Sequence, residues 1–143
     1  MNDGYRRFLA IDYGSVRIGL ALSDPMKIIA SGYRTIPNDA ATMDTLLSVI
    51  AEQDVERIIV GNPLTLKGEM RGKAEEVAAF VSRLKERTSL PVVMVDERFT
   101  SVMAQRSIRT MGVKKSERKN NKGKVDEIAA AILLQGYLDG NPR

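Results

Sequence analysis

The sequence contains no histidine, no cysteine and no tryptophan. Without histidine, Ser–His–Asp triads and the usual zinc sites are excluded. Without cysteine, the chain has neither a thiolate nucleophile nor disulfides, which suits the reducing cytoplasm where we expect the protein to work. Acid–base chemistry must therefore come from carboxylates, lysine, tyrosine or water activated by a metal ion.

Aromatic residues are few, and long apolar runs are missing. Tyrosine and phenylalanine together make up 5% of the chain. None of them flanks the basic loop at 113–123, which disfavours a platform on which single-stranded bases stack. The longest apolar run, residues 128–134, is far too short to span a membrane. The run that follows Arg7 is too short for a secretory signal, so we expect no membrane partner.

The composition is that of a globular protein. The 143 residues are 43% hydrophobic and 28% charged, which predicts one domain over residues 1–143. The net charge of +4 is unevenly distributed, because residues 98–124 hold nine basic residues and one acidic residue. Such asymmetry favours a surface that binds a polyanion such as nucleic acid, although a solvated surface would show the same composition.

Residues 8–24, FLAIDYGSVRIGLALSD, predict two strands joined by a short turn. Apolar runs at 8–11 and 18–22 are separated by a Gly-Ser turn at 14–15. Asp12 is the anomaly, because burying an ionised carboxylate without a partner costs several kcal/mol. A cation, a hydrogen-bond donor or water must therefore lie beside Asp12.

The remaining elements follow from hydrophobic periodicity and from glycine and proline breaks. We expect strands at 28–36, 55–60 and 91–95, and helices at 40–53, 73–87, 102–111 and from Lys124 onward. Between them we expect loops at 64–72 and 113–123, with a strand break at 61–63. The last helix should bury a stripe formed by Val125, Ile128, Ala129, Ile132 and Leu133.

The order of these elements predicts an α/β fold. Three strands close together in the sequence favour an antiparallel meander, and the later alternation of strands and helices favours parallel strands. We therefore expect a mixed five-stranded sheet, with three antiparallel strands followed by two parallel ones and with helices on both faces.

Three acidic residues are candidates for catalysis: Asp12, Glu97 and Asp126. They lie where strands end or helices begin, and in open parallel sheets these positions meet at one edge. Three carboxylates brought together need a cation, and oxygen ligands select Mg²⁺ or Mn²⁺ over zinc. Two such ions about 4 Å apart would activate a water and stabilise the leaving oxygen in phosphodiester hydrolysis.

Each of these acids also has a structural interpretation. Asp12 can accept hydrogen bonds from the amides of its own turn. Glu97 can favour the start of the next helix or pair with Arg98, and Asp126 can be an ordinary first-turn acid. Spacing alone does not establish that the three converge. Asp24 and Asp96 are weaker candidates, since Asp24 precedes a proline in a turn and Asp96 should point away from Glu97.

Seven basic residues are candidates for contacts with phosphates: Arg17, Lys67, Arg71, Arg98, Arg106, Lys122 and Lys124. The alternative for each is a role in surface solubility. Phosphate contacts position a nucleic acid without reading its sequence. With few aromatics nearby, recognition of the backbone and shape of structured or duplex nucleic acid fits better than stacking of single-stranded bases.

Four segments together resemble the YqgF/RuvX family of the RNase H-like superfamily, which is related to the Holliday junction resolvase RuvC. In chain order they are AIDYGSVRIGLALSD, IIVGNPLTLKG, VVMVDERFTS and KGKVDEIAAAILLQGYL. The acidic positions of the family match Asp12, Glu97 and Asp126. Asn62, in the second segment, departs from the apolar residue more usual there.

The resemblance implies an RNase H-like, divalent-metal nuclease of the bacterial cytoplasm. From the chemistry of the carboxylates we expect its cofactor to be two Mg²⁺ or Mn²⁺ ions. The resemblance also implies processing of the 5′ end of pre-16S ribosomal RNA in ribosome biogenesis, with resolution of Holliday junctions as the alternative. The expected partner is therefore nucleic acid, pre-rRNA ahead of a DNA junction. The protein is expected to be a monomer or a homodimer, and a symmetric junction would favour the homodimer.

Two further functions remain open at this point. A nucleic-acid-binding module that does not cleave would keep the fold without needing all three acids. A fragment of an actin-like ATPase or sugar kinase would explain why DYGSVRIG resembles the phosphate-binding hairpin of those enzymes. They need two such domains, however, and 143 residues hold one.

Overall fold

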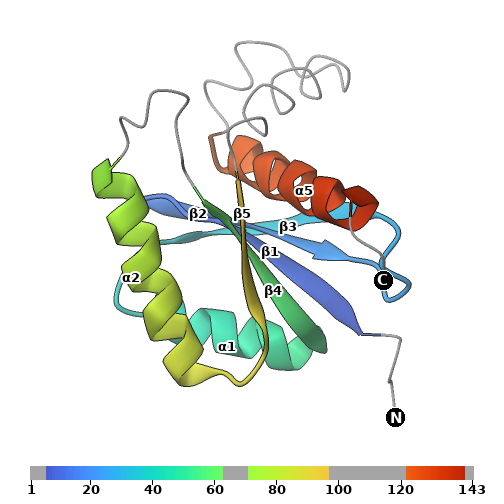
Figure 1. Cartoon of the computed structure of the whole chain (residues 1–143), viewed down its shortest axis with the longest axis horizontal. Helices are drawn as coiled ribbons and strands as arrows, with labels where there is room; N and C mark the ends of the chain where they lie inside the picture. The colour runs from blue at the N-terminus through green and yellow to red at the C-terminus, as the bar shows by residue number, and fades with distance from the viewer. Residues whose placement is uncertain (1–5, 63–70, 97–121, 141–143) are drawn as a thin grey trace.

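The computed structural model describes residues 6–62, 71–96 and 122–140. These ranges contain β1 (Arg7–Asp12), β2 (Arg17–Ser23), β3 (Ala30–Pro37), α1 (Thr42–Glu52), β4 (Val55–Asn62), α2 (Arg71–Arg87), β5 (Val92–Asp96) and α5 (Lys122–Gly140). The strands form one sheet in the order β3-β2-β1-β4-β5 (Figure 1). Strands β3, β2 and β1 are antiparallel, and β1, β4 and β5 are parallel. The predicted mixed sheet is confirmed.

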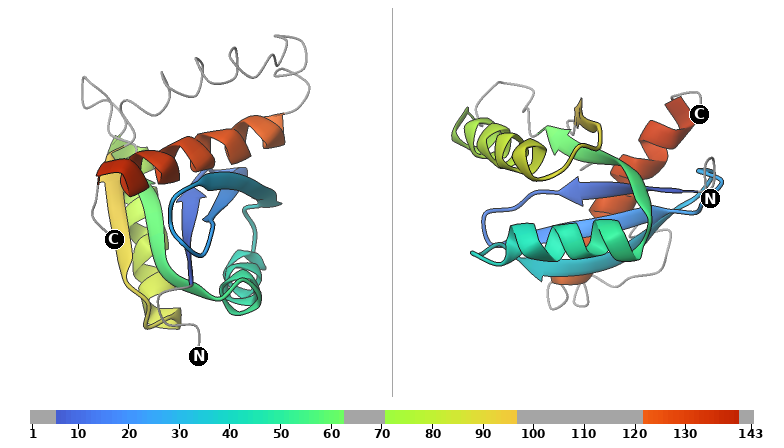
Figure 2. Two further views of the ribbon diagram at one scale, coloured as in Figure 1. Left: turned by 90° about the vertical axis from the view of Figure 1, so that its right-hand side faces the viewer. Right: turned by 90° about the horizontal axis from the view of Figure 1, so that it is seen from below.

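The helices cover the two faces of the sheet. Helices α1 and α2 pack on one face and α5 packs on the other, as the turned views in Figure 2 show. Strand β2 explains how both faces are filled, because Ile18, Leu20 and Leu22 point toward α1 and α2 whereas Ala21 points toward α5. This alternation follows directly from the period of two along a strand.

Helix α5 lies unusually close to the sheet. A side chain at Gly19 in β2 would overlap the carbonyl oxygen of Asp126 and would lie only 2.9 Å from its Cβ. A side chain at Gly32 in β3 would come within 3.1 Å of the Cβ of Glu127. Glycine at these two positions therefore lets the backbone of α5 rest on β2 and β3.

Several predicted boundaries need correction. Strand β3 begins at Ala30 rather than at residue 28, and α2 begins at Arg71 rather than at residue 73. The predicted break at 61–63 is wrong for its first two residues, since β4 continues through Asn62. Pairing of Gly61 and Asn62 with the end of β5 outweighs the weak strand preference of glycine. The predicted helix at 102–111 lies outside the described residues.

The start and the buried face of α5 also differ from expectation. The helix begins at Lys122, so residues 122–123 are helical rather than part of a loop. Ile128 and Leu133 are buried as predicted. The other three residues of the predicted stripe are only partly buried: Val125, Ala129 and Ile132. Three different residues complete the buried face: Ala130, Leu134 and Leu138.

The reason for this difference is that α5 is apolar on nearly every side, so periodicity cannot select the buried face. The small residues of β1 and β2 select it instead, because they determine where the helix can approach most closely. Apolar as it is, neither α5 nor any other helix within 6–62, 71–96 and 122–140 is suited to crossing a membrane.

Candidate active site

The carboxyl ends of the parallel strands meet at one edge of the sheet. Asp12 is the last residue of β1, Asn62 of β4 and Asp96 of β5. Ligands of open α/β sheets bind outside this edge. The sequence-predicted acid Asp12 is therefore at the edge where a site is expected.

Gly19 brings Asp12 and Asp126 together. Asp12 is directly opposite Gly19 in the antiparallel pairing of β1 with β2, and opposite residues in such a pair lie about 4.5–5.5 Å apart at their Cα atoms. Because paired residues share a face of the sheet, the half-buried Asp12 lies on the α5 side. The backbone of Asp126 rests against the same glycine from above.

The carboxylate of Asp126 is held by Arg17. The Nε of Arg17 donates to Oδ2 of Asp126 at 2.8 Å, and the two side chains are 40% and 25% exposed. Asp126 is not a first-turn acid, because α5 begins four residues earlier and has no acid in its first turn. The helix dipole therefore does not account for this carboxylate, and the ion pair with Arg17 does.

Sequence reasoning assigned Arg17 to phosphate binding and missed its pairing with Asp126. The two residues are 109 positions apart, and no local pattern connects a strand with a helix at that distance. The one available indication was the alternation of side chains along a strand, because Arg17 and Gly19 are two residues apart and must share a face of β2. That indication becomes useful only when the position of α5 is known.

Glu127, the acid next to Asp126, has a different environment. The hydroxyl of Thr35 in β3 donates to its Oε2 at 3.3 Å, and its Cβ lies over Gly32. Glu127 thus fixes α5 to β3, whereas Asp126 lies over β2. Among the His, Cys, Asp and Glu residues that the structure describes, no three gather closely enough to hold a metal ion.

The other predicted site residues are only partly covered by the structure. Four of them lie outside the described residues: Lys67, Glu97, Arg98 and Arg106. Arg71 and Lys122 are the first residues of α2 and α5. Lys124 is exposed on α5, one half-turn before Asp126. The described residues of the predicted site are therefore Asp12, Arg17, Arg71, Lys122, Lys124 and Asp126.

Asp24, a weaker candidate in the sequence, is a turn residue as predicted. Its Oδ1 accepts hydrogen bonds from the amides of Ile28 at 2.7 Å and Ile29 at 2.9 Å. Burial would raise the pKa of the Asp24 carboxyl, but these bonds outweigh burial and hold the pKa below its usual value of 3.8. The carboxylate therefore closes the β2–β3 hairpin.

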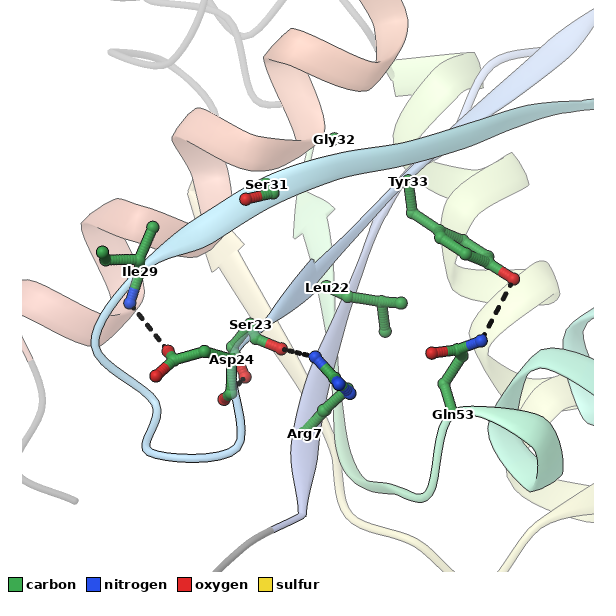
Figure 3. A pocket seen from close by; sticks show the side chains of 9 residues that line it. All are labelled: Arg7, Leu22, Ser23, Asp24, Ile29, Ser31, Gly32, Tyr33 and Gln53. Atoms are coloured by element: carbon green, nitrogen blue, oxygen red, sulfur yellow. Dashed lines mark hydrogen bonds between the residues drawn. The ribbon is translucent and has the colours of Figure 1, made fainter.

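A pocket of about 400 Å³ lies at the other end of the sheet, beside the start of β1 and the β2–β3 hairpin (Figure 3). Its lining includes Arg7, Asp24, Tyr33 and Gln53. An Nη of Arg7 donates to the carbonyl of Ser23 at 3.1 Å, and Asp24 is bonded within its own hairpin. The lining of the pocket includes neither Asp12 nor Asp126, and its one carboxylate already has a structural role.

Two solved structures with similar folds are resolvases in complex with Holliday junctions. RuvC of T. thermophilus, in complex with a Holliday junction substrate, is 15% identical with a TM-score of 0.59, and the match covers 94% of each chain. The resolvase of Fowlpox virus, also complexed with Holliday junction DNA, is 11% identical with a TM-score of 0.55, covering 94% of this chain and 97% of that one. At such identities the likeness shows the fold, which is RNase H-like as predicted.

Sequence relatives are much closer. A Bacteroides fragilis protein is 45% identical over 134 residues, covering 93% of this chain and 96% of the relative. A Porphyromonas gingivalis protein is 42% identical over 138 residues, covering 96% and 99%. Both are named "Putative pre-16S rRNA nuclease". Residues 6–140 match the family described as "RuvX: Holliday junction resolvase", and the chain therefore belongs to the RuvX family, as the resemblance predicted.

Proposed function

We propose that this protein is a divalent-metal-dependent nuclease of the cytoplasm that processes the 5′ end of pre-16S ribosomal RNA. Its class, an enzyme that hydrolyses phosphodiester bonds, follows from the family and from relatives named as nucleases. The name of those relatives supports the choice of RNA substrate. The observation that carries the proposal is the meeting of Asp12 and Asp126 at Gly19.

The donor set suits Mg²⁺ or Mn²⁺. Asp12 and Asp126 present carboxylate oxygens, the ligands that these hard cations prefer. Glu97 is the proposed third ligand, because the acidic positions of the family match Asp12, Glu97 and Asp126. When bound, the cation would make water a better nucleophile at neutral pH and offset the charge of the scissile phosphate.

The protein's own residues orient and position the substrate. Asp12 and Asp126 are fixed by the sheet and by the contact of α5 with Gly19, so their carboxylates need little reorganisation. The proposed phosphate contacts come from seven basic residues: Arg17, Lys67, Arg71, Arg98, Arg106, Lys122 and Lys124. They would hold the sugar–phosphate backbone in register without reading bases.

Resolution of Holliday junctions is the second candidate function. It is favoured by the description of the family and by two solved structures with the same fold that hold junction DNA. A junction has paired cleavage sites, so this function would call for a homodimer with two active sites. A binding module without cleavage would keep the basic surface and the fold but would not need the acids.

Cleavage assays with Asp12→Asn test the proposal. The purified protein is given Mn²⁺ or EDTA with either a 5′ segment of pre-16S RNA or a four-way DNA junction. We expect metal-dependent cutting of the RNA, reduced at least about a hundredfold by Asp12→Asn, because metal sites supply several kcal/mol to such reactions. Asp44→Asn makes the same charge change at an exposed residue of α1 and should cut normally.

Each other outcome has a clear meaning. Symmetric cutting of the junction without cutting of the RNA would replace the first function by the second. Wild-type rates for Asp12→Asn would show that the proposed acids are not the catalytic ones. Binding of RNA that weakens with salt, without any cutting, would point to the binding module.

A further inference from the structure

We propose that Arg17 is a positioning residue that holds the carboxylate of Asp126 in the absence of metal and is released to a substrate phosphate when the metal binds. This inference rests on the proposed metal site and adds an order of binding, in which the cation binds before Arg17 contacts the nucleic acid. Arg17 would contribute little to nucleic-acid binding until the cation has taken its place on Asp126. The site would then bind its substrate in a metal-dependent way.

The geometry makes the ion pair local to the site. Arg17 and Gly19 are two residues apart on β2 and share the face that α5 covers. The Nε of Arg17 is 2.8 Å from Oδ2 of Asp126, and this is the hydrogen bond that Arg17 makes to the residues described. It uses one of five N–H donors of the guanidinium, and the four on the Nη atoms can form a fork with a phosphate.

The partial exposure of the pair allows the exchange. At 40% and 25% exposure, the side chains of Arg17 and Asp126 can be reached by an ion or a phosphate from solvent. They are also sheltered enough for charges a few ångströms apart to act on each other. A cation on Asp126 would repel the guanidinium and weaken its hold on the carboxylate.

The backbone need not move for this exchange. Asp126 is fixed from below by the contact with Gly19, and α5 is fixed further along by Glu127 over Gly32. The change is therefore confined to the Arg17 side chain, which can turn from the carboxylate to a phosphate at the same edge of the sheet.

The first test measures binding of Mn²⁺ to the full-length protein by isothermal titration, with no nucleic acid present. Arg17→Gln should lower the Kd for Mn²⁺ about threefold to tenfold, because the ion no longer competes with the guanidinium. Arg17→Lys keeps the charge and should remain within about twofold of wild type.

Arg6→Gln is the matched control for this titration. It removes an ion pair in which Nε of Arg6 lies 3.0 Å from Oδ1 of Asp54, with the two side chains 35% and 45% exposed. Arg6 precedes β1 and is remote from Asp126. The variant also lowers the net charge by the same amount, so any general effect of charge would appear in it. We expect no change in the Kd for Mn²⁺.

The second test measures RNA binding in EDTA and in Ca²⁺, which serves as a cation that does not support rapid cleavage. Arg17→Gln should weaken binding of the pre-16S segment about threefold to tenfold in Ca²⁺ and leave it unchanged in EDTA. Asp126→Asn, an independent variant, should tighten binding in EDTA about threefold by releasing Arg17. Adding Arg17→Gln to that variant should remove the gain.

The outcomes separate the two proposals. If the wild-type protein binds no Mn²⁺, the metal site is wrong and both proposals fall. If it binds Mn²⁺ and Arg17→Gln binds it equally or more weakly, only the inference about Arg17 is overturned. If circular dichroism shows that Arg17→Gln does not fold, the Asp126→Asn variant tests the inference instead. Unchanged RNA binding by Asp126→Asn in EDTA would contradict the release of Arg17.

Discussion

The two faces of the sheet are built from side chains of different size. Toward α1 and α2, strands β1 and β2 present Leu9, Ile11, Ile18, Leu20 and Leu22, all of them buried. Toward α5, the same strands present Phe8 near the start of β1, and nearer the site they present Ala10, Asp12, Arg17, Gly19 and Ala21. Large apolar residues keep a helix at a distance and close the interface to water. Small residues let the backbone of α5 approach the sheet, and the charged site lies where the approach is closest.

This difference indicates that one face of the sheet serves mainly for packing, whereas the other also carries the candidate active site. The face covered by α1 and α2 is a closed hydrophobic core that stabilises the fold. The α5 face is also packed, but its close approach at Gly19 brings Asp126 of α5 near Asp12 of β1. Substitutions should therefore have different consequences on the two faces.

The largest expected effect on stability comes from the closed face. Leu84 of α2 is fully buried, and Leu84→Ala should lower the free energy of unfolding by about 2–5 kcal/mol by leaving a cavity. Urea denaturation measures this loss, with the exposed Lys85→Ala as a control that changes little. Binding of Mn²⁺ by the folded fraction should be unchanged, and a loss of it would show that the faces are not independent.

Gly19→Ala should have a smaller effect on stability and a larger one on activity. Its Cβ would overlap the carbonyl of Asp126, so α5 must shift, which we expect to cost about 1–3 kcal/mol and to abolish cleavage. Gly32→Ala should be milder, since its closest contact is a side-chain atom at 3.1 Å. Gly136→Ala is the control, because a Cβ there meets nothing within 4 Å and should stabilise the helix by up to about 1 kcal/mol.

The order of these three glycine variants tests the close approach itself. Thermal or urea denaturation should rank Gly19→Ala as the least stable and Gly136→Ala as the most stable. If Gly19→Ala is as stable and as active as the wild-type protein, α5 does not rest on β2 in the way described, and the site at this face needs another explanation.

The smallest expected effect concerns the structural carboxylate Asp24, away from both helix-covered cores. Its pKa is lower in the folded protein than its usual value of 3.8. Its contribution is therefore fully present above that value and is lost as the pH falls through the lower, folded pKa. Asp24→Asn should cost about 0.5–1 kcal/mol near pH 7 and almost nothing near pH 2, as measured by urea denaturation at the two pH values. Cleavage at pH 7 should not change, in contrast to Asp12→Asn.

The fold was largely predictable from local patterns. Period-two and helical spacing located all five strands and three of the helices, because each depends on which residues neighbour one another in sequence. The errors occurred where a partner outweighs local preference. Strand β4 continues through Gly61 because β5 pairs with it, and the buried face of α5 is chosen by Ala10 and Ala21 rather than by its own periodicity.

The sequence by itself determined the types of residue available for chemistry: carboxylates and basic residues, with no histidine or cysteine. It also determined the family, through motifs that cover nearly the whole chain. Only the tertiary structure decided that Asp126 lies above Gly19 beside Asp12, and that Arg17 holds its carboxylate. The physical reason is that these contacts join residues about a hundred positions apart, so they depend on how closely α5 can approach the sheet, and the missing side chain at Gly19 sets that distance.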